Sequence, residues 1–373
     1  MNILKTRLKC HNILVNGLHA KIGGGKNILN NYLREISQLN SICTYYVLTP
    51  DYVEYSSFEN ESVVIIDIKS FFRNILFIPY LYYFIFPRII KDYEIKVILN
   101  FGDIIIPSKI YQIYYFDWAY AVYNDSYIWQ RMSLFDFIKR KVKLFFIRKQ
   151  IAEVSKIIVQ TNNMLKRMED TFDIDNISVI PTPFGFDSPH EKNKINFNLP
   201  QDKTKFIFPS TFSPHKNFEI LYPLANLIEK ERLPFIIIIT IDQLIAKHFL
   251  KKIGKYLGKI IFNLGNIDQD NMPQLYSQSD VLFFPTLLES YGLPFIEAMF
   301  YKKPIITSDL DFAVDICGDA AFYFNPFDKI SILNAMKSYH KNKNDGQAKV
   351  KLGENIVSNL PSWKDVAHIL QKQ

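Results

Sequence analysis

Two glutamates, eight residues apart, carry the clearest chemical signal in the sequence. Glu289 and Glu297 stand in Pro285–Phe300, which reads PTLLESYGLPFIEAMF, and an apolar strand, Val281–Pro285, leads into them. A Ser-Tyr-Gly-Leu turn separates this strand from the helix that follows. Backbone N–H groups and the positive end of the dipole at a helix start bind anions. The pattern therefore indicates a site for a diphosphate between two hydroxyl-rich groups, as in a nucleotide sugar.

A glycosidase also uses two carboxylates, but the spacing of this pair disfavours hydrolysis. Glycosidase carboxyl groups lie about 5–5.5 Å or 6.5–9.5 Å apart. Eight helical residues at ~1.5 Å each would separate Glu289 and Glu297 by about 12 Å. The spacing alone therefore disfavours hydrolysis, unless the loop before the helix folds Glu289 back. A glutamate that only stabilises a helix N-terminus remains the alternative.

A lysine follows a strand in the second half of the chain. Lys216 lies in Phe208–Asn217, which reads FPSTFSPHKN and is expected to open a helix. A cation in the first turn of a helix is unfavourable to the helix dipole and requires a compensating anion. The sequence leaves open whether that anion is a bound phosphate or a nearby carboxylate such as Glu219.

A glycine-rich segment, Asn16–Lys26, follows the first predicted strand and precedes a helix expected from about Asn27 to Leu39. It contains three consecutive glycines: Gly23, Gly24 and Gly25. Glycine lets a backbone approach a ligand closely. The segment is neither the dinucleotide-binding fingerprint nor a P-loop, because Ile28 and Ala20 occupy positions where those motifs require glycine. A phosphate or acceptor loop and a plain tight turn explain it equally well.

Short apolar runs alternate with helix-length segments from end to end. In the first half the predicted strands are Asn12–Asn16, Tyr45–Leu48, Val63–Ile68, Val97–Phe101, Ile113–Phe116, Lys156–Gln160 and Ser178–Ile180. In the second half they are Phe206–Pro209, Phe235–Thr240, Ile260–Leu264, Val281–Pro285, Pro304–Thr307 and Ala321–Phe324. This rhythm predicts an α/β fold with two doubly wound parallel sheets.

The polar stretch between the two series, at Phe186–Lys203, marks the expected hinge. We therefore predict an N-terminal Rossmann-like domain over residues 1–186 and a C-terminal one over residues 187–360. We expect residues 361–373 to form a C-terminal helix, and one arrangement of this helix crosses back to the N-terminal domain. Ligands of such sheets bind outside the carboxyl ends of the strands.

The composition limits the classes of partner. With 373 residues and a net charge of +7, the chain favours anionic partners such as phosphates, and no nucleic-acid module stands out. Its cysteines have no pairing or metal-binding spacing: Cys10, Cys43 and Cys317. That favours a reducing cytoplasm, and the N-terminus lacks the features of a signal peptide.

Two segments suggest contact with an anionic membrane. Ile75–Phe86 is almost wholly apolar but too short to span a bilayer, which takes ~20 residues. Phe135–Lys149 mixes lysine and arginine with phenylalanine, as helices that lie on anionic lipid do. A buried segment and a solvated helix face are the alternatives. The expected location is cytoplasmic, with the inner face of the cell membrane as an option.

Taken together, these stretches resemble the family 4 retaining glycosyltransferases, which use nucleotide sugars and have the GT-B fold of two Rossmann-like domains facing a cleft. The motifs that carry the resemblance are Glu289–Glu297, Lys303–Ser308, Ser213–Asn217, Val159–Thr161, Val179–Pro183, Phe262–Ile267, Asp319–Pro326 and Ser362–Ala367. They cover the C-terminal half fully and the N-terminal half more thinly.

The resemblance implies a transfer of a sugar from a nucleotide diphosphate to a glycan or lipid-linked acceptor, typical of bacterial lipopolysaccharide or capsule biosynthesis. It implies catalytic roles for Glu289, Lys216 and Asp117. It implies donor binding by Ser290, Tyr291, Gly292, Leu293, Glu297, Thr211, Gly265, Asn266 and Ile267, with Gly23, Gly24 and Gly25 against the donor phosphate or the acceptor. It implies no cofactor and no metal beyond the donor substrate, and it does not distinguish UDP from GDP.

Two positions depart from the family pattern. Thr211 or Phe212 replaces an arginine that usually precedes the phosphate lysine, and Phe116-Asp117 replaces a His-Asp pair. His19 is a possible substitute for the missing histidine. These departures keep open a catalytically degenerate GT-B protein that binds a nucleotide without transfer.

A metal-dependent GT-A transferase is the remaining alternative, because it requires an Asp-x-Asp triplet after a strand. The sequence has three such triplets: Asp173–Asp175, Asp268–Asp270 and Asp309–Asp311. Only the last follows a convincing strand, and it comes too late for the early nucleotide-binding half of that fold.

Overall fold

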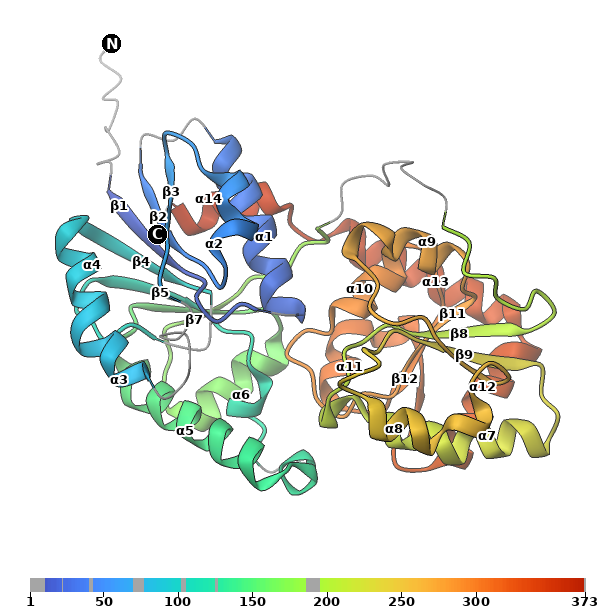
Figure 1. Ribbon diagram of the computed structural model, residues 1–373. Coiled ribbons are helices and arrows are strands. Elements are labelled where there is room, and N and C mark those ends of the chain that lie inside the picture. The colour runs from blue at the N-terminus through green and yellow to red at the C-terminus, as the bar shows by residue number, and fades with distance from the viewer. Residues whose placement is uncertain are drawn as a thin grey trace, which may run out of the picture. The chain divides into compact units, whose positions relative to one another are not determined.

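The computed structural model describes residues 11–21, 23–39, 43–69, 77–101, 105–124, 127–185 and 195–371. The chain forms two compact units (Figure 1). The first unit comprises residues 1–123, 133–183 and 361–373, and the second comprises 124–132 and 184–360. The sequence predicts residues 124–132 within the N-terminal domain, whereas in the structure they belong to the second unit.

The first unit is built on a seven-stranded sheet in the order β3-β2-β1-β4-β5-β6-β7, with every neighbouring pair parallel. Its strands are β1 Asn12–Asn16, β2 Tyr45–Leu48, β3 Val63–Ile66, β4 Ile95–Asn100, β5 Tyr111–Tyr115, β6 Lys156–Val159 and β7 Ile177–Val179. All seven predicted strands are therefore present, with ends shifted by up to two residues.

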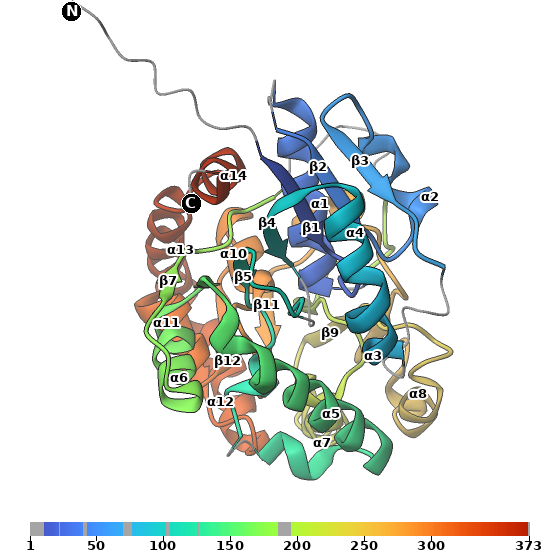
Figure 2. The same cartoon turned by 90° about the vertical axis from the view of Figure 1, so that its left-hand side faces the viewer.

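Helices cover both faces of this sheet. They are α1 Gly23–Gln38, α2 Tyr52–Tyr55, α3 Ile78–Tyr80, α4 Phe86–Asp92, α5 Leu134–Gln150, α6 Asn162–Phe172 and α14 Trp363–Gln371. On one face, α1 and α14 share a core (Figure 2) that includes Trp363, Val366 and Leu370. On the other face, α4 and the π-helical turn Leu81–Ile85 form a second core. The described part of the apolar segment Ile75–Phe86 is thus helical; it buries Ile78, Leu81, Tyr82 and Phe86 and exposes Tyr80, Tyr83 and Phe84.

The glycine triplet differs from the prediction. Helix α1 begins at Gly23 instead of about Asn27, so the three glycines form its first turn and are not part of a preceding loop. Gly23 has a φ of 62°, a left-handed conformation that glycine adopts without strain.

A row of buried amides crosses the first sheet. Asn16 Nδ2 donates to Asn100 Oδ1 at 2.9 Å, and Asn100 Nδ2 donates to Gln112 Oε1. Gln112 Nε2 in turn donates to the carbonyl of Ile106. These three side chains are at most 1% exposed. Buried amides are tolerated because they satisfy one another.

The second unit contains a six-stranded parallel sheet in the order β10-β9-β8-β11-β12-β13. Its strands are β8 Thr204–Phe208, β9 Phe235–Ile239, β10 Ile261–Asn263, β11 Val281–Phe284, β12 Ile305–Ser308 and β13 Ala321–Phe324. Its helices are α7 Leu221–Lys230, α8 Lys247–Lys252, α9 Met272–Ser277, α10 Leu293–Phe300, α11 Asp311–Cys317, α12 Lys329–Lys341 and α13 Lys343–Ser358. All six predicted strands are again present.

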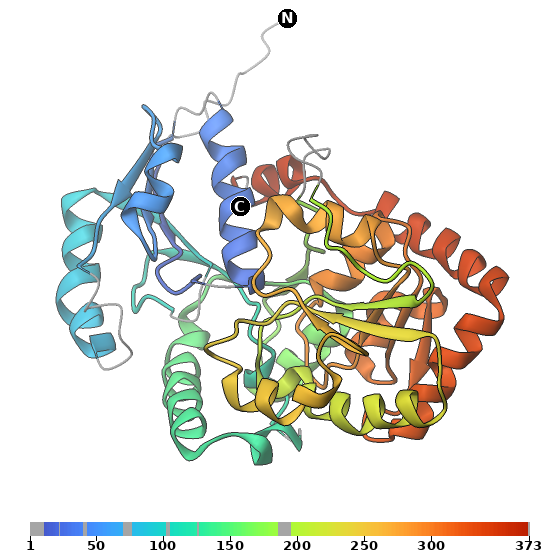
Figure 3. The same ribbon diagram turned by 45° about the vertical axis from the view of Figure 1, so that its right-hand side comes forward.

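The second sheet is apolar except at strand ends, where Thr204 and Lys205 begin β8 and Thr307 and Ser308 end β12. Strand β9, between β10 and β8, is no more than 1% exposed at any residue. Helices α7 and α12 pack together below the sheet in Figure 3, and α10 packs with α13 above it. The polar side chains of this unit that matter for chemistry gather at the carboxyl ends of β8 and β11.

Candidate active site

An ion pair links the ends of two neighbouring strands of the second sheet. Lys216 Nζ lies 2.6 Å from Glu289 Oε1, and the two side chains are 12% and 11% exposed. The Thr286 hydroxyl donates to the same carboxylate oxygen at 2.6 Å. The Lys216 ammonium also lies 4.8 Å from the ring centroid of Phe284. Sequence analysis singled out both charged residues, and the structure brings them together.

The anion that compensates Lys216 is Glu289 and not Glu219, which is exposed. Lys216 does not lie in the first turn of a longer helix, as the sequence suggested. It ends a 3-10 turn, Pro214–Lys216, because Asn217 adopts a left-handed conformation with a φ of 60°. The predicted conflict with a helix dipole therefore does not arise.

Backbone contacts fix this turn to the strand β11 exit. The carbonyl of His215 accepts a hydrogen bond from the Leu287 N–H at 2.7 Å. Lys216 and Glu289 are thus held by the main chain as well as by their charges.

A second anchor of the turn comes from residues 124–132. Arg131 Nη1 donates to Asn217 Oδ1 at 3.0 Å, and Asn217 Nδ2 donates to the Pro326 carbonyl at 2.9 Å. The guanidinium lies 5.0 Å from the ring centroid of Tyr127 and 6.0 Å from that of Phe327. These residues line a cavity of about 650 Å³ together with Glu219, Ile220 and Pro223. No sequence motif pointed to Arg131.

The turn before α10 depends on a glycine. Gly292 has a φ of 72°, and a Cβ at this position would lie 2.7 Å from the Phe295 ring. Any other residue would therefore be both strained and crowded. Ser290 and Leu293 flank this turn half-buried, and Tyr291 is buried. The first N–H groups of α10 have no partner within the helix, as at every helix start.

The second glutamate of the pair is held by a tyrosine. The Tyr276 hydroxyl donates to Glu297 Oε2 at 2.9 Å. Burial raises the pKa of Glu297 from 4.5 to about 7, and the hydrogen bond from Tyr276 opposes that shift. Burial also raises the pKa of Tyr276 well above its ordinary value. Tyr276 was not recognised from the sequence, because it lies 21 residues before its partner, on another helix.

The segment after β10 was predicted to lie near the nucleotide base. Gly265 has a φ of 73°, and its N–H donates to Asn263 Oδ1 at 3.2 Å. Asn266 is exposed and donates to Asp242 Oδ2 at 3.2 Å, whereas Ile267 packs against the core. Asn263 also bonds both backbone groups of Ile241. The loop therefore has a fixed shape.

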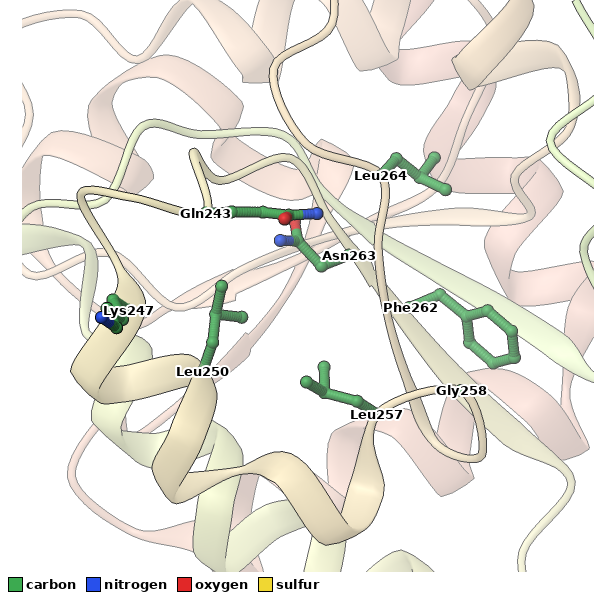
Figure 4. Close-up of a pocket in the computed structure, with 8 residues that line it drawn as sticks. All are labelled: Gln243, Lys247, Leu250, Leu257, Gly258, Phe262, Asn263 and Leu264. Carbon is green, nitrogen blue, oxygen red and sulfur yellow. The ribbon is translucent and has the colours of Figure 1, made fainter.

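A cavity of about 450 Å³ opens beside this segment (Figure 4). It is lined by Gln243, Lys247, Leu250, Leu257, Gly258, Phe262, Asn263 and Leu264. It lies along the edge strand β10, whereas Lys216 and Glu289 follow β8 and β11. With strands about 4.8 Å apart, the cavity and the ion pair are separated by roughly two strand spacings.

Thr211 lies on the loop after β8 and is exposed. Its backbone carbonyl accepts a hydrogen bond from the Ser210 hydroxyl. Its side chain replaces the family arginine without bringing a charge. Arg131 is a cation next to the same loop.

In the first unit, Asp117 follows β5 and lies at the first turn of α1. A Cβ on Gly25 would come within 3.1 Å of Asp117 Oδ2. The predicted acceptor residue and the predicted glycine segment are therefore neighbours, while Gly23 and Gly24 are exposed. A carboxylate at a helix N-terminus is favourable to the dipole. His19 lies between β1 and α1 and is half-buried.

The three acidic triplets lie on separate segments of the chain, and their aspartates are exposed: Asp173, Asp175, Asp268, Asp270, Asp309 and Asp311. Over the described residues, no cluster of three or more histidine, cysteine, aspartate or glutamate side chains is arranged to hold a metal ion.

Comparison with known proteins relates the chain to enzymes of polysaccharide synthesis. A family model, glycosyl transferases group 1, matches residues 189–357. The O-antigen chain mannosyltransferase RfbU of Salmonella typhimurium is 25% identical over 212 residues, which are 54% of this chain and 56% of that protein. The serotype-specific mannosyltransferase WbdA of Escherichia coli is 32% identical over 120 residues, 31% of this chain and 14% of that protein. The chain thus spans about half, or less, of the length of these relatives.

The fold is shared along the whole chain. The structure of Anabaena Alr3699/HepE in complex with UDP and glucose matches with a TM-score of 0.72 at 15% identity, covering 97% of this chain and 100% of that one. This likeness, with two parallel sheets, confirms the predicted GT-B fold. The GT-A alternative is therefore wrong.

Proposed function

We propose, from the match of residues 189–357 to the glycosyl transferases group 1 family model, that the protein transfers a sugar from a nucleoside diphosphate donor to a glycan or lipid-linked acceptor. The observation that carries this proposal is the half-buried ion pair between Lys216 and Glu289 at the carboxyl ends of β8 and β11. Ligands of doubly wound sheets bind at these ends.

The chemistry of the pair suits a departing diphosphate. As the bond between the anomeric carbon and the phosphate oxygen breaks, negative charge develops on that oxygen, and the Lys216 ammonium neutralises it. The N–H groups of residues 290–293 at the start of α10 hold the diphosphate. Glu289 accepts hydrogen bonds from the sugar hydroxyls.

We propose that the configuration at the anomeric carbon is retained and that no metal takes part. The acceptor oxygen attacks from the face that the diphosphate leaves, and its proton passes to the departing phosphate oxygen. Asp117, beside Gly25 in the first unit, orients the acceptor hydroxyl. Nuclear magnetic resonance of the product establishes the configuration, and turnover in a chelator tests the metal.

The names of the relatives suggest the sugar. Both RfbU and WbdA are described as mannosyltransferases, so we propose a mannosyl donor and a place in O-antigen or capsule synthesis. The UDP in the Anabaena structure keeps the choice of nucleotide open. Release of nucleoside diphosphate from GDP-mannose, UDP-glucose and UDP-N-acetylglucosamine, with a synthetic alkyl mannoside as acceptor, distinguishes these donors.

Turnover of one donor that is lost in Glu289→Gln, with the fold intact, supports the proposal. Nucleotide binding without turnover in either form favours the degenerate GT-B protein. Binding at a hundred times the dissociation constant adds ~2.7 kcal/mol to stability, enough to raise the melting temperature visibly.

A surface of the first unit suits an anionic membrane. Helix α5 exposes a stripe of Phe135, Ile138, Val142 and Phe145, the two phenylalanines being 77% and 61% exposed. At 100° per residue, these side chains span about 80° of the helix. The opposite side carries Leu144 and Ile147, which are buried.

The cations of α5 also fall into two groups, one that packs on the first unit and one that lies near the apolar stripe. Arg140 and Lys143 stack on Tyr120 and Trp118 of the first unit, at 4.7 Å and 3.7 Å from the ring centroids. The cations on or beside the stripe are exposed: Lys139, Lys141 and Lys149. An apolar stripe with flanking cations binds the interface of an anionic bilayer. We therefore propose that the protein works at such a surface. None of the helices in the described ranges is long and apolar enough to cross a membrane.

Flotation with liposomes tests this surface. The wild type is expected to float with vesicles containing phosphatidylglycerol and not with pure phosphatidylcholine, and Phe135→Ser/Phe145→Ser is expected to stay in solution. Leu244→Ser/Ile245→Ser is the matched control, because those residues are 85% and 73% exposed on the second unit. Equal flotation of both double variants would contradict the assignment.

A further inference from the structure

The two oxygens of the Glu297 carboxylate have different surroundings. Oε2 accepts the hydroxyl of Tyr276 at 2.9 Å. Tyr276 has a second, weaker contact at 3.5 Å with the carbonyl of Pro294, one turn earlier in α10. A carboxylate with one oxygen bound in this way has a fixed orientation, and its other oxygen remains for a ligand.

Tyr276 itself is held from several sides. It is fully buried, and its ring stacks on Tyr301 with centroids 5.0 Å apart and planes 20° apart. Gln278, directly after α9, anchors this helix to the segment before β8. Its Nε2 donates to the Ile195 carbonyl at 2.6 Å, and its Oε1 accepts a hydrogen bond from the Phe197 N–H at 3.0 Å. The hydroxyl therefore has little freedom to leave Glu297.

We propose that Tyr276 is a positioning residue for the donor nucleotide: it holds Oε2 of Glu297 so that Oε1 is presented to the ribose hydroxyls. This inference rests on the proposed function, in which Glu297 binds the ribose. Two adjacent hydroxyls bind best to a carboxylate that is both oriented and ionised, since hydrogen bonds to charged groups are the stronger ones.

The surroundings of Glu297 make this arrangement depend on pH. Among the described residues, the ionisable groups that interact with it are Tyr276 of α9 and Tyr301 after α10, and burial raises the pKa of both tyrosines. Helix α13 meets α10 at Gly353, and its Glu354 is paired with Lys302. Glu297, with a pKa of about 7, is thus the group of this cluster that titrates near neutrality.

The direction of the effect follows from the charge of the binding form. If the ribose binds to ionised Glu297, nucleotide affinity rises as the pH increases through about 7. The Tyr276 hydrogen bond favours the ionised carboxylate. Its removal in Tyr276→Phe raises the pKa of Glu297 and moves the midpoint of the affinity profile to higher pH.

The experiment is calorimetric titration of the full chain with GDP, UDP and their 2′,3′-dideoxy analogues between pH 6 and 9. The variants are Tyr276→Phe and Glu297→Gln. Tyr339→Phe is the matched control, because this buried tyrosine of the same unit donates to the Asp280 carbonyl instead. Circular dichroism verifies that each variant is folded.

Three results are expected. The wild type prefers the ribonucleotide over the dideoxy analogue, and Glu297→Gln loses this preference. Tyr276→Phe weakens ribonucleotide binding about tenfold at pH 7, as loss of a hydrogen bond to a charged group does. Its affinity midpoint lies at higher pH, while binding of the dideoxy analogue and the behaviour of Tyr339→Phe are unchanged.

The possible failures are distinct. If neither nucleotide binds to the wild type, the proposed function is overturned and this inference with it. If ribose preference depends on Glu297 but Tyr276→Phe has the wild-type affinity and pH profile, only the role of Tyr276 is overturned. An equal loss for the ribonucleotide and the dideoxy analogue also overturns it, because that loss indicates general damage to the site.

Discussion

The two sheets of this protein treat polar groups in opposite ways. The first sheet carries neutral amides inside its strands, where Asn16, Asn100 and Gln112 bond one another. The second sheet keeps its buried polar side chains at strand ends, and at its carboxyl edge Lys216 pairs with Glu289. A neutral amide row costs little once it is satisfied, and a half-buried charge must have a partner. The first arrangement therefore serves the fold, and the second is available for chemistry.

Removal of one member of the charged pair is the strongest test of this difference between the two sheets. Lys216→Ala and Glu289→Ala are each expected to lower sugar transfer by about 10²–10³-fold or more, as loss of a group that stabilises transition-state charge does. Each also leaves a charge without its partner, which for fully buried pairs costs about 3–5 kcal/mol and here less. Donor turnover and urea unfolding measure the two effects.

The double variant Lys216→Ala/Glu289→Ala is the control. It is expected to be more stable than the sum of the single effects predicts, because neither charge is left unpaired, yet to remain inactive. Additive losses of stability would show that the ion pair contributes nothing to the second unit.

Glu297, at the same edge of the second sheet, allows its effect on stability to be compared with its effect on nucleotide binding. Its pKa of about 7 in the folded chain exceeds its ordinary value of 4.5, so the folded state binds more protons between those pH values. The free energy of unfolding therefore falls as the pH rises from about 4.5 to 7 and stays lowered above that. The difference between these two pKa values of Glu297 corresponds to a loss of at most about 3 kcal/mol in the free energy of unfolding.

Glu297→Gln removes this titration and keeps an acceptor for Tyr276. We expect it to be more stable than the wild type at pH 8 and nearly equal to it at pH 4.5, while it binds nucleotide more weakly. Urea unfolding at both pH values is the measurement. A stability difference of the same size at both would show that ionisation of Glu297 is not the cause.

The amide row is tested by replacing one of its members with an apolar residue. Asn100→Leu is expected to destabilise the first unit by about 2–3 kcal/mol, because it removes the acceptor of Asn16 Nδ2 and one donor to Gln112 Oε1 in a buried place. Nucleotide binding by the second unit is expected to be unchanged. Asn100→Leu/Gln112→Met is expected to lose less than the two single variants together, since more of the row is then apolar.

The smallest effect concerns the anchor of the Lys216 turn. Arg131→Ala removes the contact with Asn217 and the stacking on Tyr127. We expect nucleotide affinity to fall by about three- to tenfold, in line with one hydrogen bond and one cation–π contact. Arg131→Lys keeps the charge without the planar stack, so an intermediate affinity is expected. Unchanged affinity in both would mean that the turn holds its shape without this anchor.

Much of the fold was predictable from the sequence, because runs such as Phe235–Ile239 and Val281–Phe284 are too apolar and too short for anything but buried parallel strands. The identity of the charged residues was also predictable, since local motifs mark Lys216, Glu289 and Glu297. Their donor and acceptor roles remain predictions that the variants above test.

The partners of these residues were not predictable. Glu289 lies 73 residues from Lys216, and the two meet only because β8 and β11 are neighbours in the sheet. Tyr276 and Arg131 act across helices and turns that no short motif links. The glycine triplet was misassigned to a loop because glycine disfavours a helix interior, whereas its first turn tolerates it. The first half of the expected hinge, residues 186–194, lies outside the described residues.

The packing of α14 on α1 has a consequence for the order in which the protein is made. Trp363, Val366 and Leu370 belong to the core of the first unit, and Gln371 bonds the hydroxyl of Tyr45. A nascent chain therefore emerges with its first α/β layer incomplete, and the second unit is synthesised before the missing helix arrives. The first unit therefore completes its core only after residues 363–371 have left the ribosome, once the second unit has been made.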